Sequence, residues 1–342
     1  MGGQNSGRVA VVGAGIVGLS VAWFLQEEGF DVTVFDQVGV AAGASAGNAG
    51  WICPGMSAPL PEPSVLRYAL SSLLRRDSPL RVAPTALPST ARFLAAFALC
   101  CSERKWLGGV SRFAQLNALA QSSYDLLARG GVTGLLLDAP VLMAFDNRAQ
   151  AAPVAHELQA LGDAGERYDV TELSVHDLRA ELPLLSGRAR HGLRLDGQRF
   201  VQPLGYVQSL AESVQARGAD IQVRVPVTGV RSAERGRVSM TAAGLTTAFD
   251  KCVIANGAWL SSLARSAGVR VPMAAGRGYS FTVRTKVQLT APLYLPALRV
   301  ACTPISGGMR VAGTMEFQTA CPSSARPGSL ASSWPAGMAC GV

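Results

Sequence analysis

Residues 9–18 read Val-Ala-Val-Val-Gly-Ala-Gly-Ile-Val-Gly, and residues 32–36 read Val-Thr-Val-Phe-Asp. A β-branched strand, a turn with three glycines, a helical stretch and a second strand ending in an acid form one β-turn-α-β unit. Gly13 permits the sharp exit from the strand, Gly15 lets a pyrophosphate approach the backbone, and Gly18 lets the helix pack close to the sheet. The pattern predicts a dinucleotide-binding turn.

The helix and the acid that follow the turn support this prediction. A helix from Ile16 to about Glu28 would direct its free N–H groups and positive dipole end at the phosphates, and Gly29 stands where a glycine would end it. A carboxylate at Asp36 accepts hydrogen bonds from ribose hydroxyls and repels a 2′-phosphate, so FAD or NAD fits better than NADP. The residues expected to line the turn are Gly13, Ala14, Gly15, Ile16, Val17 and Gly18.

Composition bounds the class of protein. The chain has 342 residues, of which 49% are hydrophobic and 16% charged, enough for about two domains. No apolar run reaches the roughly 18 residues that span a bilayer, and the polar residues 1–8 lead straight into the first strand without a secretory signal. The seven cysteines show no Cys-x-x-Cys spacing. We therefore expect reduced thiols and a cytoplasmic location.

The net charge of +8 has several readings. No basic run or aromatic-basic motif supports nucleic-acid binding, so attraction to an anionic substrate or membrane surface is the better functional explanation, and an arginine-rich proteome accounts for the charge equally well. A short amphipathic helix is predicted over Ser64–Arg76, with leucines on one face and arginines beside it. It could rest peripherally on the inner face of the cell membrane, although a helix packing inward gives the same pattern.

No βαβ repeat continues directly after the second strand, which disfavours an NAD dehydrogenase. Elements typical of a nucleotide-binding domain return much later, so that domain should be discontinuous. The predicted later elements are helices over 111–129 and 203–217, strands over 221–225 and 252–255, paired strands over 227–230 and 238–241, and further strands over 279–285, 299–303 and 309–312.

At this point the chain resembles the FAD-dependent D-amino-acid oxidase superfamily, and most closely its D-amino-acid dehydrogenases. The resemblance runs from Val9 to about Phe317. The matching segments are the glycine turn with Asp36, Ser-Ala-Gly-Asn-Ala-Gly at 45–50, Pro-Gly-Met-Ser-Ala-Pro at 54–59, Val-Gln-Pro-Leu-Gly-Tyr at 201–206, Val-Ile-Ala-Asn-Gly-Ala-Trp at 253–259, Gly-Tyr-Ser at 278–280 and Arg-Val-Ala-Gly-Thr-Met-Glu-Phe at 310–317.

The resemblance implies an α/β fold: a discontinuous, Rossmann-like FAD-binding domain of the glutathione-reductase type with an inserted α+β substrate domain on an antiparallel sheet. We expect the FAD-binding domain over 1–60 and 197–268, and the substrate domain over 61–196 and 269–317. FAD would bind in extended form. The residues implied beside it are Ser45, Asn48, Ala49 and Gly50 at the flavin, Val227 on the adenine side, and Ala255 and Gly257 near the cofactor.

The resemblance also implies the chemistry. The family oxidises the Cα–H bond of an amino acid by hydride transfer to flavin N5, and the imino acid hydrolyses to a 2-oxo acid and ammonia. Substrate-pocket candidates are Met315 and Tyr279, although Tyr279 could equally be an aromatic residue packing in the sheet. Electrons would pass to a quinone or another carrier. The alternatives are a glycine- or sarcosine-type amine oxidase using oxygen, and a non-catalytic remnant. No metal-ligand cluster is present in the sequence.

Residues 318–342 depart from the family pattern. They carry one charged residue, Arg326, and many Ser, Pro and Ala residues. The family's Trp-x-Gly-x-Arg-Pro block, whose arginine binds the substrate carboxylate, is not found. We expect this tail to reflect a frameshift or truncation and to weaken FAD retention and stability.

Overall fold

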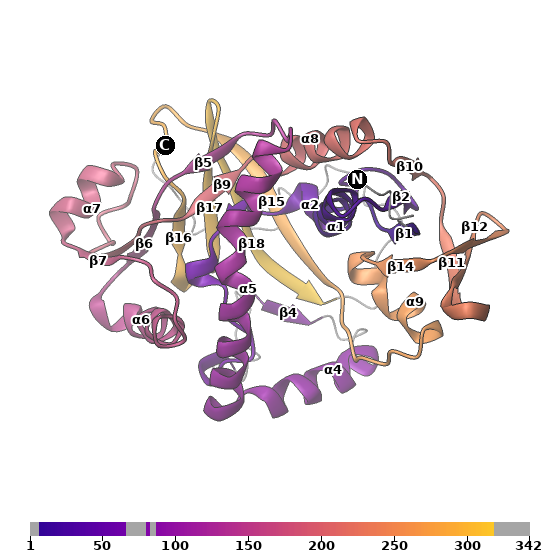
Figure 1. The fold of residues 1–342 in the computed structure, drawn as a ribbon. Coiled ribbons are helices and arrows are strands. Elements are labelled where there is room, and N and C mark those ends of the chain that lie inside the picture. Colours follow the sequence, from indigo (N-terminus) through magenta and orange to yellow (C-terminus); the bar gives the residue numbers. More distant parts are fainter. Residues whose placement is uncertain (1–6, 66–79, 83–86, 318–342) are drawn as a thin grey trace. The chain divides into compact units, whose positions relative to one another are not determined.

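The computed structural model describes residues 7–65, 80–82 and 87–317 (Figure 1). The chain forms two compact units, each assembled from segments that are far apart in the sequence. The first unit contains residues 1–48, 122–135 and 202–273. The second contains residues 49–121, 136–201 and 274–342. Each unit therefore depends on contacts between distant parts of the chain.

The first unit is built on a four-stranded parallel sheet of order β10-β2-β1-β14. Helix α1 follows β1 and packs against the sheet with α8 beside it. The elements of this unit are β1 (Arg8–Val12), α1 (Ile16–Glu27), β2 (Asp31–Asp36), α2 (Ala44–Gly47), α8 (Pro203–Ala216), β10 (Asp220–Val223), β11 (Val227–Ser232), η3 (Glu234–Gly236), β12 (Val238–Ala242), β13 (Leu245–Phe249), β14 (Lys251–Ile254), η4 (Gly257–Trp259) and α9 (Leu260–Ser266).

A small antiparallel sheet, β11-β12-β13, completes the first unit. Its apolar face shares one core with the parallel sheet, in which Phe35 and Phe249 meet edge to face with ring centroids 6.0 Å apart. The paired strands predicted over 227–230 and 238–241 are confirmed, because Val230 stands opposite Met240 in the β11-β12 register. Alternation of apolar and polar residues was sufficient to predict this pair.

The second unit is built on an eight-stranded mixed sheet. Seven strands follow the order β15-β18-β17-β16-β6-β8-β7, and β4 pairs with β18. The elements of this unit are β3 (Trp51–Ile52), η1 (Pro54–Met56), β4 (Leu80–Val82), α4 (Leu87–Cys100), β5 (Leu136–Asp138), β6 (Val141–Phe145), α6 (Arg148–Asp163), β7 (Val170–Leu173), α7 (Val175–Glu181), β8 (His191–Leu195), β9 (Arg199–Val201), β15 (Gly276–Arg284), β16 (Leu293–Leu295), η5 (Pro296–Leu298), β17 (Val300–Ile305) and β18 (Gly308–Phe317).

The predicted fold class is confirmed: the protein is α/β, with a parallel sheet and separate antiparallel sheets. The large sheet is mainly antiparallel, but the β16-β6 and β18-β4 pairs are parallel. The strands predicted late in the chain are present as β15, β17 and β18. Strands β6, β8 and β7, which join this sheet through β16, were not predicted, because no local signal links residues 141–195 to residues 276–317.

Helix α5 (Glu103–Arg129) begins eight residues before the predicted start at Ser111. Its first turns are stabilised by buried Trp106 and Val110, which pack against α6 residues. The helix begins with three charged residues, Glu103, Arg104 and Lys105. Because they interrupt the apolar periodicity, the sequence pattern does not reveal this first part of the helix. Residues up to 121 of this helix are grouped with the second unit and the later ones with the first.

The first unit also contains residues 122–135, which the sequence assigns to the substrate domain. This segment is held by α8: the rings of Tyr124 and Tyr206 lie 5.5 Å apart, and the Thr133 N–H donates to Ser209 Oγ at 2.8 Å. The functional domain boundaries remain a prediction.

Two predicted features fall largely outside the described residues. These are the amphipathic helix over Ser64–Arg76, of which only residues 64 and 65 are described, and the tail 318–342. Within the described parts of the chain, no helix combines the length and apolar character needed to cross a bilayer.

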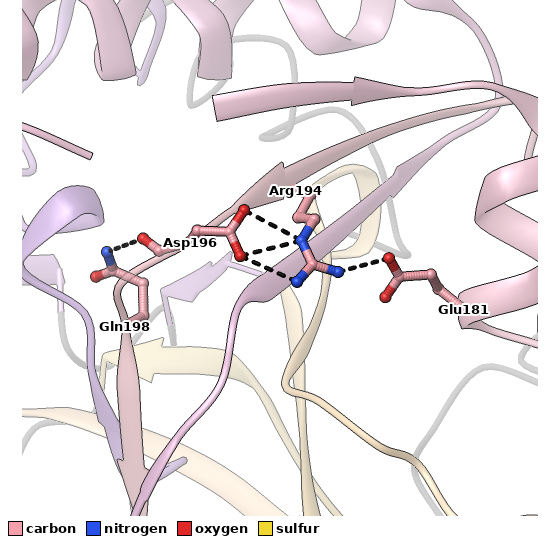
Figure 2. Close-up of polar contacts among 4 residues, drawn as sticks. All are labelled: Glu181, Arg194, Asp196 and Gln198. Atoms are coloured by element: carbon pink, nitrogen blue, oxygen red, sulfur yellow. Dashed lines mark hydrogen bonds and ion pairs between the residues drawn. The ribbon is translucent and has the colours of Figure 1, made fainter. Parts of the chain in front are cut away.

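An arginine on β8 fastens helix α7 to the large sheet. Figure 2 shows the guanidinium of Arg194 between two acids: Nη1 is 2.5 Å from Glu181 Oε1, and Nε donates to both carboxylate oxygens of Asp196 at 3.0 and 3.1 Å. Gln198 continues the contact by donating to the Asp196 carbonyl at 2.9 Å. These acids raise the pKa of Arg194, with Asp196 the larger cause.

We expect Arg194→Met to lower the free energy of unfolding by about 1–3 kcal/mol, because two carboxylates would lose their shared donor while half-buried. Urea unfolding would measure the change. Arg188→Met is the matched control, since its ion pair with Asp146 is long at 3.6 Å and its side chain is 83% exposed. Equal midpoints for the two variants would contradict the role given to Arg194.

Candidate dinucleotide and substrate sites

The turn after β1 is shaped by two glycines. Gly13 has φ +113°, and a Cβ there would lie 2.5 Å from the carbonyl oxygen of Ala255. A Cβ on Gly18 would lie 1.9 Å from the carbonyl oxygen of Gly13, which no side chain tolerates. The packing role predicted for Gly18 is therefore confirmed. Both contacts fix the turn between β1 and α1. The outer side of the turn is left as glycine backbone without a covering side chain.

Helix α1 begins at this bare turn. Gly15 is its N-cap and offers no side-chain hydrogen bond, and the first turn contains no acid. The N–H of Ile16 instead donates to Ser45 Oγ at 3.0 Å. Val17 is 62% exposed although it lies in the first turn of a helix that packs on a sheet. This helix end can therefore accept an anion, for which the positive end of the helix dipole is suited.

Asp36 ends β2 and holds the neighbouring loops with its carboxylate. Oδ2 accepts from the N–H of Ala14 at 2.9 Å, and Oδ1 accepts from the N–H groups of Val38 and Gly39 at 2.8 and 2.9 Å. A carboxylate has about four acceptor positions. Three are used by the backbone, so capacity for one ribose hydroxyl remains. The sequence predicted the ribose role and missed this bracing role.

The loop after β14 lies against the same turn. The N–H of Ala255 donates to the carbonyl of Val12 at 2.8 Å, and Gly257 has φ +59°. Between them, the Asn256 side-chain oxygen is buried without a hydrogen-bond partner in the described structure. A buried acceptor without a partner is costly, and a ligand donor would relieve that cost. Sequence reasoning had not singled out Asn256.

The remaining cofactor candidates have defined positions. Val227 begins β11 and is partly buried against the core of the first unit. Asn48 donates from Nδ2 to the Ser45 carbonyl at 2.8 Å. Ala49 and Gly50 belong to the second unit, where their carbonyls accept from Thr303 Oγ1 at 2.7 Å and from the Val201 N–H at 2.8 Å. The segment 45–50 is thus divided between the two units.

The first unit brings together Gly13, Ala14, Gly15, Ile16, Val17, Gly18, Asp36, Ser45 and Ala255 at the carboxyl ends of parallel strands. In such sheets, ligands bind at this edge. A helix end whose N-cap residue offers no side-chain acceptor, a close glycine backbone and an acid with spare acceptor capacity are the donor and acceptor groups that a dinucleotide needs. These residues fit FAD, whose diphosphate would meet the helix end and whose ribose would meet Asp36.

The two substrate-pocket candidates lie on neighbouring strands of the second unit. Tyr279 stands opposite Gly313, and the backbone of Met315 stands opposite Gly278. A register shift separates these two pairs. The register places Tyr279 on the face of the sheet that carries Met309 and Val311, which both belong to an apolar core. This favours the packing role for Tyr279 that the sequence left open.

A buried carboxyl group of α6 was missed by sequence reasoning. Burial raises the pKa of Glu157 to about 7, the negative charge of Glu62 raises it further, and the positive charge of Arg299 opposes both. Burial also raises the pKa of the neighbouring Tyr294, on which Arg299 and Glu157 act as well. An isolated glutamate in a helix gives no sequence signal for this environment.

Comparison with known proteins identifies the family. Residues 8–335 match the FAD dependent oxidoreductase (DAO) profile. The chain belongs to this DAO family of FAD-dependent oxidoreductases. It is similar to D-amino acid dehydrogenase of Phenylobacterium zucineum (strain HLK1), with 30% identity over 322 residues, which cover 91% of this chain and 74% of the relative.

Two solved structures have the same fold. One is L-alpha-glycerophosphate oxidase from Mycoplasma pneumoniae with FAD bound, with TM-score 0.67, 17% identity and coverage of 92% of this chain and 72% of that one. The other is glycine oxidase from Bacillus cereus ATCC 14579, with TM-score 0.65, 20% identity and coverage of 94% and 74%.

Membership of the DAO family makes FAD the cofactor of this protein and places it among the FAD-dependent amino-acid dehydrogenases and oxidases. Within the described residues, no three His, Cys, Asp or Glu side chains come together as metal ligands. The cysteines of that part of the chain, at positions 53, 100, 101, 252 and 302, are free thiols. Burial raises the pKa of the Cys53 thiol to about 12, so it is unreactive at neutral pH.

Substitutions at Gly15 and Gly18, which flank the start of α1, should affect cofactor binding and folding separately. We expect Gly18→Ala to cost about 2–3 kcal/mol of stability, because its methyl group would overlap the Gly13 carbonyl. Gly15→Ala meets only the rotatable Ser45 hydroxyl, at 3.0 Å, so it should fold normally but bind FAD at least ~10-fold more weakly. Thermal unfolding and flavin fluorescence titration measure the two effects.

Gly39→Ala is the control for these variants, since nothing lies within 4 Å of a Cβ at that position. It should match the wild type in both measurements. FAD affinity of Gly15→Ala equal to that of the wild type would overturn the assignment of this turn to the diphosphate.

The titration of Glu157 should make stability depend on pH. A glutamate has a pKa of 4.5 when solvated, whereas the folded protein raises that of Glu157 to about 7. The folded state therefore holds the proton more tightly, and this group's contribution to stability falls as the pH rises from 4.5 to 7. Glu157→Gln removes the titration. We expect equal stabilities near pH 4.5 and a variant more stable by about 1–3 kcal/mol at pH 8.

Chemical unfolding across this pH range tests the prediction. Glu212→Gln on α8 is the control, because Glu212 is exposed, and its curve should follow the wild type. A constant difference between Glu157→Gln and the wild type at every pH would rule out the titration.

Proposed function

We propose that the protein oxidises D-amino acids to imino acids, which water hydrolyses to 2-oxo acids and ammonia. The observation that carries the proposal is the similarity, at about 30% identity over 91% of the chain, to relatives named D-amino acid dehydrogenase. FAD supplies the electron sink for this chemistry when it is bound. The protein must then orient the substrate and hold its charged groups.

The residues of the first unit, with the neighbouring Ala49 and Gly50, bind the cofactor in this proposal. The N–H groups at the start of α1 hold the diphosphate, Asp36 holds a ribose hydroxyl, and Val227 meets the adenine side. Ala255 and Gly257 lie near the cofactor. Ser45, Asn48, Ala49 and Gly50 approach the flavin. The second unit supplies the substrate pocket, with the β15-β18 region around Met315 as its candidate wall and Tyr279, whose register favours packing, as the weaker candidate.

The electron acceptor in this proposal is a quinone or another carrier, which fits the naming of the relatives as dehydrogenases. A quinone acceptor would be reached from the inner face of the cell membrane, by peripheral contact of the predicted 64–76 helix. The alternative is direct use of oxygen, as in an amine oxidase acting on glycine or sarcosine.

Anaerobic mixing with amino acids tests the reaction. We expect the flavin absorbance to bleach with D-alanine and to stay unchanged with L-alanine. In air, D-alanine should reduce an added quinone analogue or redox dye, with little peroxide formed. Peroxide equal to the glycine or sarcosine consumed would identify an oxidase instead. A bound flavin that no amine bleaches would identify a non-catalytic protein.

A further inference from the structure

A cavity of about 360 Å³ lies within the second unit, between helix α5 and the loop that follows α6. From α5 it is lined by Ala114 and Ala118, which stand one turn apart, and from the loop by residues 164–168. Small side chains on both sides, including Ala164 and Gly165, leave this space open. Its volume falls within the range of about 300–1,000 Å³ that is typical of small-molecule sites. None of the residues expected at the cofactor or in the substrate pocket lines it.

The loop that lines the cavity is the end of α6. Ala164 is the C-cap of this helix, Gly165 follows with φ +101°, and the N–H of Glu166 donates back to the Leu161 carbonyl at 3.1 Å. The C-terminal end of a helix dipole is negative and favours a cation. The last turn of α6 contains no basic residue, so the helix does not supply that cation itself.

Glu166 adds a full negative charge at this helix end. It is partly buried, and its Oε1 accepts from Asn117 Nδ2 at 2.6 Å. Asn117 is 8% exposed and also donates to the carbonyls of Pro54 and Ser57, at 3.3 and 2.9 Å, so it fixes the carboxylate in place. Burial raises the pKa of Glu166 and the hydrogen bond from Asn117 opposes this, while no cation contributes. A partly desolvated carboxylate without a cationic partner is stabilised by a cationic ligand.

Two donor groups also line the cavity. Arg167 is exposed, and it forms no ion pair within the part of the chain that the structure describes. The ring of Tyr168 lies against Gly55 and Gly197, where an added Cβ would come within 2.8 and 3.4 Å of it. Burial, and after it the charge of Glu166, raises the pKa of Tyr168 to about 12, so its hydroxyl keeps its proton at neutral pH. A guanidinium and a phenol hydroxyl both donate to carboxylates.

We propose that this cavity binds a free α-amino acid, with its ammonium group at Glu166 and the end of α6 and its carboxylate at Arg167. An α-amino acid fits this lining because it carries both charged groups on one carbon. The alanines of α5 leave room for a small side chain. The occupant would bridge α5 and the loop after α6 without any covalent step, and binding does not involve the flavin. The inference therefore does not rest on the proposed function.

The test titrates the full-length, FAD-loaded protein with L-alanine in a calorimeter, because the proposed reaction leaves L-alanine unoxidised. We expect L-alanine to bind the wild type and to bind Glu166→Gln roughly 10–100-fold more weakly, the size of one charge-assisted contact. The glutamine keeps an acceptor for Asn117, so this variant should fold normally. Ethylamine, which lacks the carboxylate, and propionate, which lacks the ammonium group, should each bind at least ~10-fold more weakly than L-alanine.

A second variant fills the cavity without changing its charge. Ala118 is exposed on α5, so Ala118→Leu adds volume to the cavity without crowding a packed core, and L-alanine binding should be lost. Ala155→Leu is the matched control for this change, and Asp169→Asn is the control for Glu166→Gln. Both residues are exposed and lie outside the lining of the cavity. These two variants should bind L-alanine as the wild type does.

Failure of L-alanine to bind the wild type would overturn the site. Equal affinity of the wild type, Glu166→Gln and Ala118→Leu would overturn it as well, because the ligand would then be bound elsewhere. If Glu166→Gln does not fold, which thermal unfolding shows, Ala118→Leu decides by the same titration. A protein that binds L-alanine in this cavity but never oxidises D-alanine would refute only the proposed function.

Discussion

Helix α1 can lie against strand β1 only because no side chain stands at Gly18. The distance of 1.9 Å from an ideal Cβ to the Gly13 carbonyl leaves no room for even a methyl group. This contact places the start of α1 directly above the end of the strand, where the turn exposes bare backbone. The same constraint that packs the helix also prepares its first N–H groups for a phosphate.

The first unit stabilises this turn from three directions. Asp36 accepts from the Ala14 N–H, Ser45 accepts from the Ile16 N–H, and the carbonyl of Ala255 lies against Gly13. Each contact comes from a different segment of the chain. A turn held in this way would need little rearrangement to accept the diphosphate that we propose for it, which would reduce the entropic cost of binding.

The second unit is organised around one large sheet. Its two faces both have apolar cores, but one face is left polar over β17, β18 and β15. The half-buried Arg310 and the buried Thr303 lie there among hydroxyl groups, while Glu157, whose pKa burial raises to about 7, belongs to the helix over the apolar half. Buried polar groups reduce stability unless they are satisfied, and these two residues have hydrogen-bond partners: Thr303 bonds to Ala49 and Arg310 to Ser280.

Much of the local structure could be predicted from the sequence. The extent of α1, its end at Gly29 and the strand that ends in Asp36 follow from glycine positions and β-branched runs, which act within a few residues. The β11-β12 pair follows from alternation over a short turn. The bracing bonds of Asp36 and the environments of Asn256, Glu157 and Arg310 could not be predicted, because each depends on neighbours that are distant in the chain.

The sequence by itself determined the glycine turn between β1 and α1, the fold class, the cofactor and the family, since these depend on backbone requirements that only certain residues meet at fixed spacing. The tertiary structure alone decided that β16 joins β6 and that residues 122–135 pack with α8. It also decided that Arg310 and Thr303 face one way while Val311 faces the other. Such facts depend on strand register and burial, which arise when distant segments pair and which no local pattern encodes.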